Sequence, residues 1–221
     1  MDRLYRQFVR RGDLVFDIGA HVGDRVAAFR RLEARVVAVE PQPALVKTLR
    51  LLYRRDPKVT IEAAAVGRQP GFIELSVNLD NPTVSTVSTD FIAATASAPG
   101  WKGQTWPKRL RVPLTTIDEL IARHGMPAFI KIDVEGFEAE ALAGLGQPVQ
   151  ALSFEFTLIQ HDIALACVER CSALGYTRFN AALGESQILA HADWIGGDAI
   201  ARWLTELPPA ANSGDVYAAL A

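Results

Sequence analysis

The stretch Asp13-Leu-Val-Phe-Asp-Ile-Gly-Ala-His-Val-Gly-Asp24 decides the fold. Its apolar run Leu14–Ile18 is typical of a strand that is buried on both faces of a sheet. Gly19 and Gly23 then bound a tight turn, after which a helical pattern of apolar residues begins. A helix that starts directly after such a turn presents free backbone N–H groups, and glycine lets a ligand approach closely because it has no Cβ. The stretch therefore predicts the nucleotide-side turn of an open α/β sheet.

Two acidic residues decide which nucleotide ligand suits this turn. A dinucleotide site reads Gly-x-Gly-x-x-Gly, whereas this turn reads Asp-x-Gly-x-x-x-Gly, with Asp17 in place of the first glycine. A carboxylate there would repel a pyrophosphate but could pair with S-adenosylmethionine, which carries a sulfonium, an ammonium and no phosphate. Glu40 ends the next apolar run, about 20 residues later, where an acidic residue is placed to bind ribose hydroxyls. Together these residues favour S-adenosylmethionine over NAD.

The bulk composition restricts the class of protein. A chain of 221 residues with 49% hydrophobic and 22% charged residues is expected to form one soluble α/β domain over residues 1–221. The formal charge of −2 gives no electrostatic reason to expect a nucleic acid or an anionic membrane as partner. No run approaches the ~20 apolar residues of a membrane span, and Met1–Gly12 lacks the apolar segment of a secretory signal. We therefore expect a cytoplasmic location. Cys167 and Cys171 are expected to be core residues on one helix face.

Strand and helix patterns alternate from Leu14 to Leu174. The expected buried strands are Leu14–Ile18, Arg35–Glu40, Val59–Ala64, Ala128–Asp133 and Val149–Phe156. Right-handed crossovers make these five strands parallel. A strand from Tyr176, a helix near Ile200–Leu207 and a last strand near Asp215–Leu220 would add an antiparallel edge. The expected fold is a Rossmann-like, doubly wound, mostly parallel sheet whose ligand crevice lies beside the first strand.

Two segments stand outside this alternation. Apolar residues of Met1–Arg11 recur at helical spacing and predict an N-terminal helix that caps the sheet. Residues 78–109 are polar at first and then, from Phe91, show no clear periodicity, so we expect a substrate-side loop or insert. Trp101 and Trp106 in this segment could stack on sugar or base rings. Aromatic residues in a loop more often hold that loop against the domain.

With these residues in hand, the sequence resembles the FkbM-type family of S-adenosylmethionine-dependent methyltransferases. The first two blocks that carry the resemblance, Val15-Phe-Asp-Ile-Gly-Ala-His-Val-Gly23 and Val39-Glu-Pro-Gln-Pro43, occur across many methyltransferases. The distinctive blocks are Arg111-Val-Pro-Leu-Thr-Thr-Ile-Asp-Glu-Leu120 and Ile130-Lys-Ile-Asp-Val-Glu-Gly-Phe-Glu138. The resemblance covers roughly residues 12–156 and implies a methyltransferase with S-adenosyl-L-methionine as cofactor.

The resemblance also implies roles for single residues. Asp17 and Gly19 would face the methionine part of the cofactor, while Glu40 would hold the ribose hydroxyls. The methionine end and the reacting methyl group would lie near Asp133. The full set of expected cofactor-binding residues is Asp17, Gly19, Ala20, His21, Gly23, Glu40, Pro41, Ala65, Val66 and Asp133, with Ala65 or Val66 near the adenine and His21 contributing its backbone N–H.

Methyl transfer to a hydroxyl requires a base beside the acceptor. The candidate catalytic residues are Asp133, Glu135, Glu155 and His161, which follow strands or begin the next helix. Glu135 could equally be a first-turn helix acid, and Glu155 and His161 could be structural hydrogen-bond partners. A divalent metal held by Asp133, Glu135 and Glu155 is chemically reasonable, but the spacing matches no known ligand signature, so no metal is expected.

The sequence thus predicts an S-adenosylmethionine-dependent methyltransferase, most consistent with O-methylation of a hydroxyl on a sugar or small-molecule natural product. The Asn/Asp-Pro-Pro-aromatic turn used for exocyclic amines is absent, as is the Pro-Cys nucleophile used on base carbons. Two alternatives stay open: a non-catalytic domain of the same fold that binds the cofactor or a partner, and an NAD-dependent oxidoreductase, against which Asp17 argues. A homo-oligomer is also left open.

Overall fold

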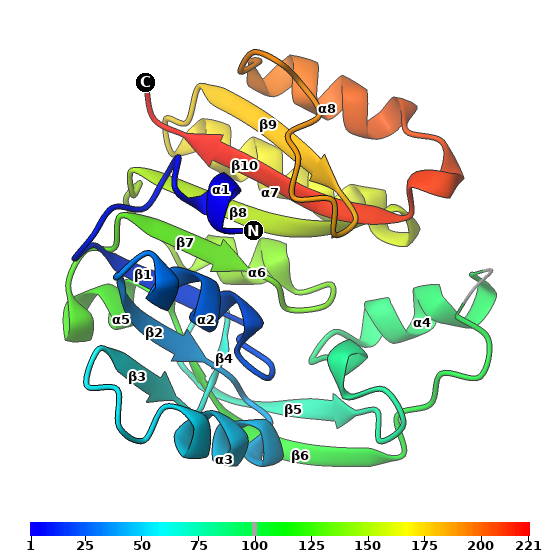
Figure 1. Cartoon of the computed structure of the whole chain (residues 1–221). Coiled ribbons are helices and arrows are strands. Elements are labelled where there is room, and N and C mark those ends of the chain that lie inside the picture. The colour runs from blue at the N-terminus through cyan, green and yellow to red at the C-terminus, as the bar shows by residue number, and fades with distance from the viewer. Residues whose placement is uncertain (99–100) are drawn as a thin grey trace.

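The computed structural model describes residues 1–98 and 101–221, and it places helices on both faces of a central seven-stranded sheet (Figure 1). The strand order is β3-β2-β1-β7-β8-β10-β9. These strands are β1 (Leu14–Ile18), β2 (Arg35–Val39), β3 (Val59–Glu62), β7 (Phe129–Ile132), β8 (Ala151–Thr157), β9 (Arg178–Leu183) and β10 (Ser213–Ala219). The order reverses between β1 and β7, which is the switch point where ligands bind in such sheets.

The strand directions confirm the expected fold. The five expected strands β1, β2, β3, β7 and β8 pair in parallel. The expected antiparallel pairing at the C-terminal side is made by β10, which runs antiparallel to both β8 and β9. The last strand of the chain therefore inserts between two earlier strands.

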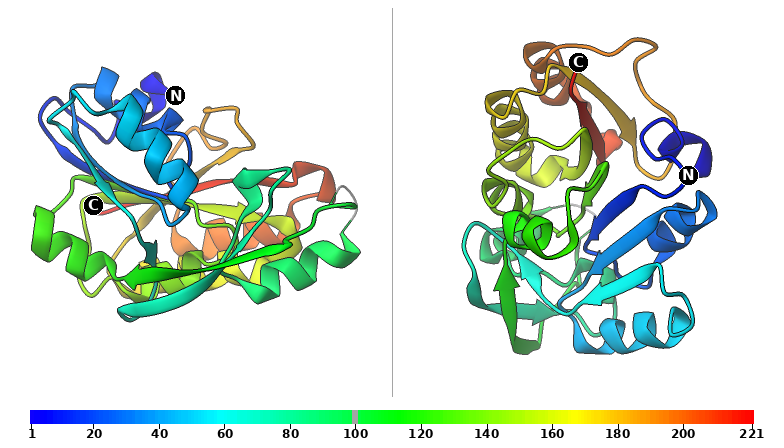
Figure 2. Two further views of the ribbon diagram at one scale, coloured as in Figure 1. Left: turned by 90° about the horizontal axis from the view of Figure 1, so that it is seen from below. Right: turned by 90° about the vertical axis from the view of Figure 1, so that its left-hand side faces the viewer.

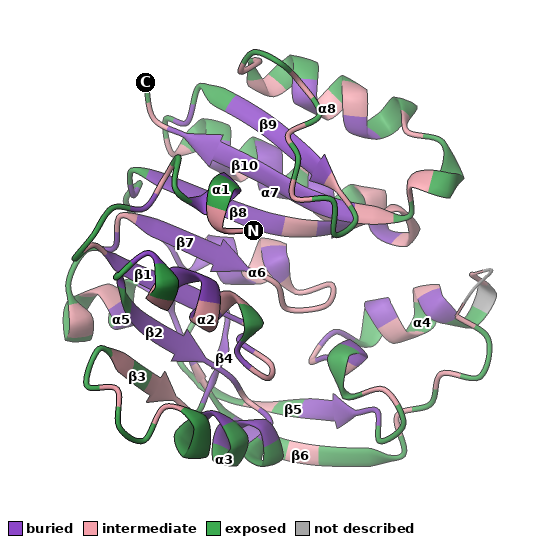
Figure 3. Ribbon diagram, viewed as in Figure 1, coloured by how far each residue is buried: buried purple, intermediate pink, exposed green. Residues whose placement is uncertain are grey.

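The helices cover the two faces of this sheet as separate layers (Figure 2). One layer contains α1 (Asp2–Tyr5), α2 (Asp24–Arg31) and α3 (Pro43–Leu52). The other contains α5 (Ile117–His124), α6 (Glu138–Ala143), α7 (His161–Ala173) and α8 (Gly197–Glu206). Side chains alternate between the layers: Phe16 and Ile18 of β1 join the second core, whereas Val15 joins the first. The strands between the layers are mostly buried, except the edge strand β3 (Figure 3). Burial of apolar side chains from both faces stabilises such strands.

The N-terminal segment covers the sheet with less helix than expected. Only Asp2–Tyr5 is α-helical, although the expected helix extended to Arg11. The cap is nevertheless aromatic and close: the Tyr5 ring lies 4.5 Å from Phe29, and the Phe8 ring stacks 5.5 Å from Tyr217, measured between ring centroids. Beyond Tyr5, turn hydrogen bonds such as the one from the Val9 N–H to the Tyr5 carbonyl act together with aromatic packing on the sheet.

A second, three-stranded sheet packs beside the first, in the order β4-β6-β5. It consists of β4 (Ala65–Val66), β5 (Gly71–Val77) and β6 (Lys108–Thr115). The insert between β5 and β6 contains the 3-10 turn η1 (Pro82–Val84) and the helix α4 (Thr89–Ser97), and two further 3-10 turns are η2 (Leu158–Gln160) and η3 (Pro209–Ala211).

The helix α4 corrects the expectation that residues from Phe91 onward have no regular structure. Ser88 precedes the helix, and its side-chain oxygen accepts a hydrogen bond from the Phe91 N–H, as an N-cap residue does. Trp101 packs edge-on against Phe91, and the Trp106 indole N–H donates to the Val84 carbonyl. The two tryptophans hold the insert together. Along the described chain, no helix combines the length and the apolar character needed to cross a bilayer.

Candidate active site

A cavity of about 290 Å³ opens at the carboxyl ends of β1, β2 and β7. Residues that follow these three strands form most of its wall, and the insert covers it with Thr83, Ser85, Thr86 and Val87. Of the expected site residues, Gly19, Ala20, His21, Glu40, Pro41, Ala65, Val66, Asp133 and Glu135 lie on this wall. Asp17, Gly23, Glu155 and His161 do not.

The glycines of the turn serve the packing of the chain as well as the cavity. Gly19 has a φ of +85°, and a Cβ at this position would collide with the backbone carbonyl of Asp133. Gly23, with a φ of +92°, begins α2, and a Cβ there would lie 2.9 Å from a methyl carbon of Leu49. Only glycine allows β1, β7 and α3 to approach this closely. The turn is therefore constrained by its neighbours, in addition to any ligand.

Asp17 lies behind the turn and not on the cavity wall, so its contact with the cofactor stays a prediction. The residue alternates with Phe16 and Ile18, so its side chain points into the layer of α2, where the Val26 N–H donates to it. Its other carboxyl oxygen has no hydrogen-bond partner among the described residues. Burial raises the pKa of Asp17 to about 7, against the opposing effect of the positive charges on Lys131 and Arg25.

Glu40 reaches the wall directly from the end of β2. One of its carboxylate oxygens accepts the His21 N–H at 2.9 Å and the other accepts the Gln42 N–H at 2.8 Å. These bonds connect the β1 and β2 loops through one side chain that is 3% exposed. Burial raises its pKa to about 7, although both hydrogen bonds act in the opposite direction. Glu40 therefore shapes the cavity and still presents acceptor lone pairs to it.

Three carboxyl groups gather where β7 and β8 end. Asp133 and Glu135 lie on the wall, and each of these residues and Glu155 offers a carboxylate oxygen within 4.8 Å of the others. Burial favours the neutral form of Asp133, but the Lys131 ammonium and a hydrogen bond from Glu155 lower the pKa of Asp133 overall. Burial, followed by repulsion from Asp133, raises the pKa values of Glu135 and Glu155. Of the four expected catalytic residues, the structure brings these three together.

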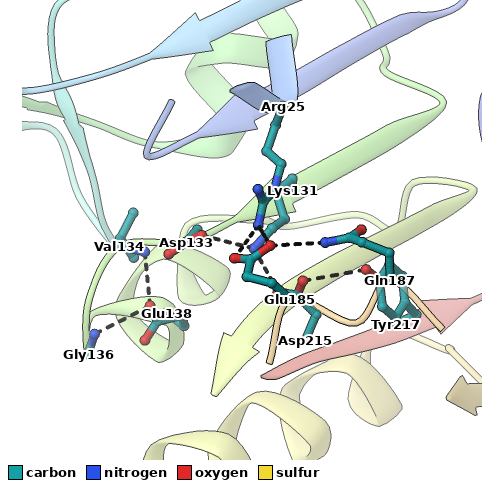
Figure 4. Close-up of polar contacts among 10 residues, drawn as sticks. All are labelled: Arg25, Lys131, Asp133, Val134, Gly136, Glu138, Glu185, Gln187, Asp215 and Tyr217. Carbon is teal, nitrogen blue, oxygen red and sulfur yellow. Dashed lines mark hydrogen bonds and ion pairs between the residues drawn. The ribbon is translucent and has the colours of Figure 1, made fainter. Parts of the chain in front are cut away.

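Lys131 connects Asp133 of this group to Asp215 of β10 (Figure 4). Its side chain is 1% exposed, and its ammonium donates to Asp215 at 2.7 Å and to Asp133 at 3.2 Å. Val134 and Gly136, in the loop after β7, donate their N–H groups to the Glu138 carboxylate. The loop is thus held from both sides. His161 starts α7 away from the cavity, and its Nε2 has no partner among the described residues.

Several wall residues could not be anticipated because they come from the insert or lie on helix faces. Arg25, in α2, donates two hydrogen bonds to the Glu185 carboxylate at 2.8 and 2.9 Å. Gln42 donates to the Pro82 carbonyl and accepts from the Ser85 hydroxyl, so it anchors the insert to β2. For Gln42, the only indication in the sequence is its position as a polar residue directly before a helix.

Most of the ionisable groups on the wall are acidic. The ionisable groups on it, apart from the imidazole of His21, are the five carboxyl groups of Asp24, Glu40, Asp133, Glu135 and Glu185 and the guanidinium of Arg25. An acidic cavity attracts a cationic ligand and repels a pyrophosphate. Ala64, Ala65, Val66 and Leu75 give the cavity an apolar side next to the acidic one. This arrangement fits a ligand with an aromatic ring at one end and positive charge at the other.

Comparison with known proteins agrees with this geometry. The solved structure of a precorrin-6Y C5,15-methyltransferase from Geobacter metallireducens has a TM-score of 0.51 at 12% identity, covering 99% of this chain and 84% of that chain. A TehB-like methyltransferase from Corynebacterium glutamicum has a TM-score of 0.50 at 12% identity, covering 100% of this chain and 86% of that chain. Fibrillarin from Aeropyrum pernix was crystallised with bound S-adenosyl-L-methionine. Its structure has a TM-score of 0.52 at 8% identity, covering 96% of this chain and 68% of that chain. At these identities the likeness shows the fold.

The family is shown by the sequence itself. Residues 17–197, most of the chain, match the family described as Methyltransferase FkbM domain. No curated protein is significantly similar to the chain in sequence. The match includes the turn after β1, the strand end at Glu40 and the loop after β7, which are the places where the cavity is built. The chain belongs to the FkbM family of S-adenosylmethionine-dependent methyltransferases.

Proposed function

We propose that this protein methylates a hydroxyl group of a sugar or another small molecule, with S-adenosylmethionine as methyl donor. The observation that carries the proposal is the cavity at the switch point of the sheet, with five carboxyl groups and one guanidinium on its wall. A sulfonium and an ammonium suit this charge, whereas the pyrophosphate of NAD does not. The preference for S-adenosylmethionine over NAD therefore rests on the acidic residues of the wall, because Asp17 lies behind that wall.

The residues on the wall divide the cavity between the parts of the cofactor. We assign the ribose hydroxyls to Glu40 and the adenine ring to Ala65 and Val66, which lie on the wall. We assign the methionine part to Gly19, Ala20 and His21, which also lie on the wall. When bound, S-adenosylmethionine supplies a methyl group on a positively charged sulfur, which becomes a neutral thioether once the methyl group has left.

The acceptor side favours a hydroxyl. A hydroxyl must lose its proton as its oxygen takes the methyl group, so a base has to lie beside it. Asp133 and Glu135 are carboxyl groups on the wall at the mouth of β7 and can accept that proton. The insert closes over the same place through Thr86, whose hydroxyl donates to the Glu135 carbonyl at 2.6 Å. A covered cavity of about 290 Å³ favours a small acceptor over a polymer.

Calorimetric titration tests the cofactor. Wild-type protein is expected to bind S-adenosylmethionine and S-adenosylhomocysteine and to ignore NAD. Ala65→Leu should weaken binding of both adenosyl ligands because the added side chain fills the apolar side of the cavity. Glu140→Gln, on the outer surface of α6, is the matched control and should bind like the wild type. Binding of NAD alone would overturn the proposal.

An acceptor screen tests the reaction. Incubation with methyl-labelled S-adenosylmethionine and a panel of hydroxylated, amine and carbon acceptors should label only hydroxylated molecules. Transfer to an amine or a carbon would contradict O-methylation while leaving the methyltransferase assignment intact. Cofactor binding without transfer to any acceptor would favour the non-catalytic domain.

A further inference from the structure

The three carboxyl groups at the ends of β7 and β8 form a group with the dimensions of a cation site. One oxygen each from Asp133, Glu135 and Glu155 lies within 4.8 Å of the other two. Oxygen ligands bind Mg²⁺ or Ca²⁺ at about 2.0–2.6 Å, so two ligands on opposite sides of one ion lie about 4–5 Å apart. Asp133 and Glu135 reach this point from the main cavity, and Glu155 reaches it from the far side.

A fourth oxygen lies near this group and is unpaired among the described residues. Gln160 is 7% exposed, and its buried amide oxygen accepts no hydrogen bond in the part of the chain that the structure describes. That oxygen lies so close to Gly136, the residue after Glu135, that a Cβ on Gly136 would collide with it. Gln160 and Glu155 also line one small cavity of about 10 Å³, close to the space that a single water molecule needs. A buried amide oxygen is costly to leave unpaired, so its neighbourhood calls for a ligand.

The neighbouring side-chain cations do not neutralise the three carboxylates, so a divalent cation could bind there. Lys131 is the cation that contacts the group, and it is closer to Asp215, at 2.7 Å, than to Asp133, at 3.2 Å. Arg25 is occupied by two hydrogen bonds to Glu185. With Lys131 balanced by Asp215, the three carboxylates together carry up to three negative charges in a half-buried place. Like charges this close require protons or a cation between them.

We propose that Asp133, Glu135 and Glu155 bind one divalent cation of the Mg²⁺ type, and that Gln160 accepts a hydrogen bond from a water molecule that completes its coordination. Carboxylate and water oxygens are the ligands this class of ion prefers. The site revises the sequence-based expectation of no metal. The sequence shows no metal-ligand signature, because Asp133 and Glu135 lie in the loop after β7 whereas Glu155 lies in the neighbouring strand β8.

The location gives the ion a use, and this step rests on the proposed function. Two of its ligands lie on the wall of the main cavity, where an acceptor hydroxyl would enter. A cation that binds the hydroxyl oxygen lowers the pKa of that hydroxyl and fixes its position, while a carboxylate still receives the proton. Acceptors with two neighbouring oxygens, such as vicinal diols, would bind this ion best.

Manganese binding tests the site without any acceptor. Chelator-treated protein is titrated with Mn²⁺, and free Mn²⁺ is measured by electron paramagnetic resonance. The wild type should bind one Mn²⁺ per chain, and excess Mg²⁺ should displace it. Gln160→Leu should weaken binding about tenfold, as loss of an outer-shell partner does. Glu155→Gln removes a ligand charge and should weaken it further, to about a hundredfold or more.

Controls separate this result from the proposed function. Glu140→Gln removes a carboxylate from the surface of α6, where it pairs with Arg68, and should leave Mn²⁺ binding unchanged. Each variant is also titrated with S-adenosylmethionine; because Glu155 and Gln160 lie off the main cavity wall, that binding reports an intact fold. A wild type that binds S-adenosylmethionine but no Mn²⁺ at millimolar concentration overturns the cation site alone. Mn²⁺ binding that survives unchanged in Glu155→Gln places the ion elsewhere and also overturns it.

Discussion

At the level of single residues, Lys131 connects the sheet to the candidate site. It lies in β7 beside Asp17 of β1 and Ser153 of β8, and all three point into the layer of α1 and α2. Its ammonium joins Asp215 of β10 to Asp133 at the cavity. A buried ammonium is stable only when its partners are in place. One side chain therefore couples the position of Asp133 to the C-terminal strand.

Replacing Lys131 by methionine should destabilise the protein strongly. The substitution keeps the apolar stem but leaves Asp133 and Asp215 without their cation, and removing one partner of a buried ion pair typically costs about 3–5 kcal/mol. Equilibrium unfolding in urea measures this. Arg109→Met, which breaks the exposed pair with Glu74, is the control and should cost about 0–1 kcal/mol. Adding Asp215→Asn to Lys131→Met should recover part of the loss; equal effects of Lys131→Met and Arg109→Met would contradict the coupling.

The residue types of the site were easier to predict than their directions. Glu40, Ala65 and Asp133 lie on the cavity wall as expected, because the carboxyl ends of neighbouring parallel strands meet at one edge. Asp17 lies off the wall, and the sequence does not reveal which face of β1 turns toward α2. Gln160 gave no signal at all, because its contact with Gly136 depends on how η2 packs against the loop after β7.

At the level of elements, the insert between β5 and β6 is joined to the loop after β7 through Thr86. This threonine is 1% exposed; its hydroxyl donates to the Glu135 carbonyl and accepts the Ser88 N–H at 2.8 Å. The second of these bonds orients the residue that caps α4. The Thr86 hydroxyl therefore holds the insert against the loop after β7, in addition to the contacts that Gln42 makes with Pro82 and Ser85.

Thr86→Val should loosen the insert while leaving the main sheet in place. The variant leaves a buried N–H and a buried carbonyl unpaired, which costs about 1–3 kcal/mol for each group. Hydrogen exchange should speed up in residues 78–98 and stay unchanged in β1 and β7. Thr48→Val is the matched control, because the Thr48 hydroxyl donates to Ala44 on the exposed side of α3. Uniform acceleration across the chain, or none in the insert, would refute the role of Thr86.

The elements that the sequence predicted are those with strong local patterns. The buried strands of the main sheet follow from apolar runs. The strand pairing of the second sheet does not follow from local patterns, because β4 has only two residues and pairs with β6, about fifty positions later in the chain. The placement of β10 between β8 and β9 is likewise set by packing of distant segments. The helix α4 is short and has a weak apolar pattern, so its N-cap residue Ser88 is the main indication of it in the sequence.

At the level of the whole molecule, the folded protein holds protons that the unfolded chain releases. Burial raises the pKa values of Asp17, Glu40 and Glu138 to about 7, from ordinary values of 3.8 or 4.5. Between about pH 4.5 and 7 the folded state therefore binds more protons than the unfolded state. The free energy of unfolding is then highest at the acidic end of this window and falls as the pH rises through 7. Asp133, whose pKa is lowered, acts in the opposite sense only below about pH 4.

Glu138→Gln isolates one of these protons. The glutamine oxygen can still accept the N–H groups of Val134 and Gly136, which now meet Glu138 at 2.9 and 3.3 Å, but the side chain stays neutral at every pH. Chelator-treated wild type and variant are unfolded in urea at a series of pH values from 4 to 8. The stability of the wild type relative to the variant should fall by roughly 2–4 kcal/mol across this series, because only the wild type must ionise a buried carboxyl group. If the unfolding free energies of the wild type and the variant depend on pH in the same way, Glu138 has the same pKa in the folded and unfolded states. That result would contradict the stabilising role of its proton.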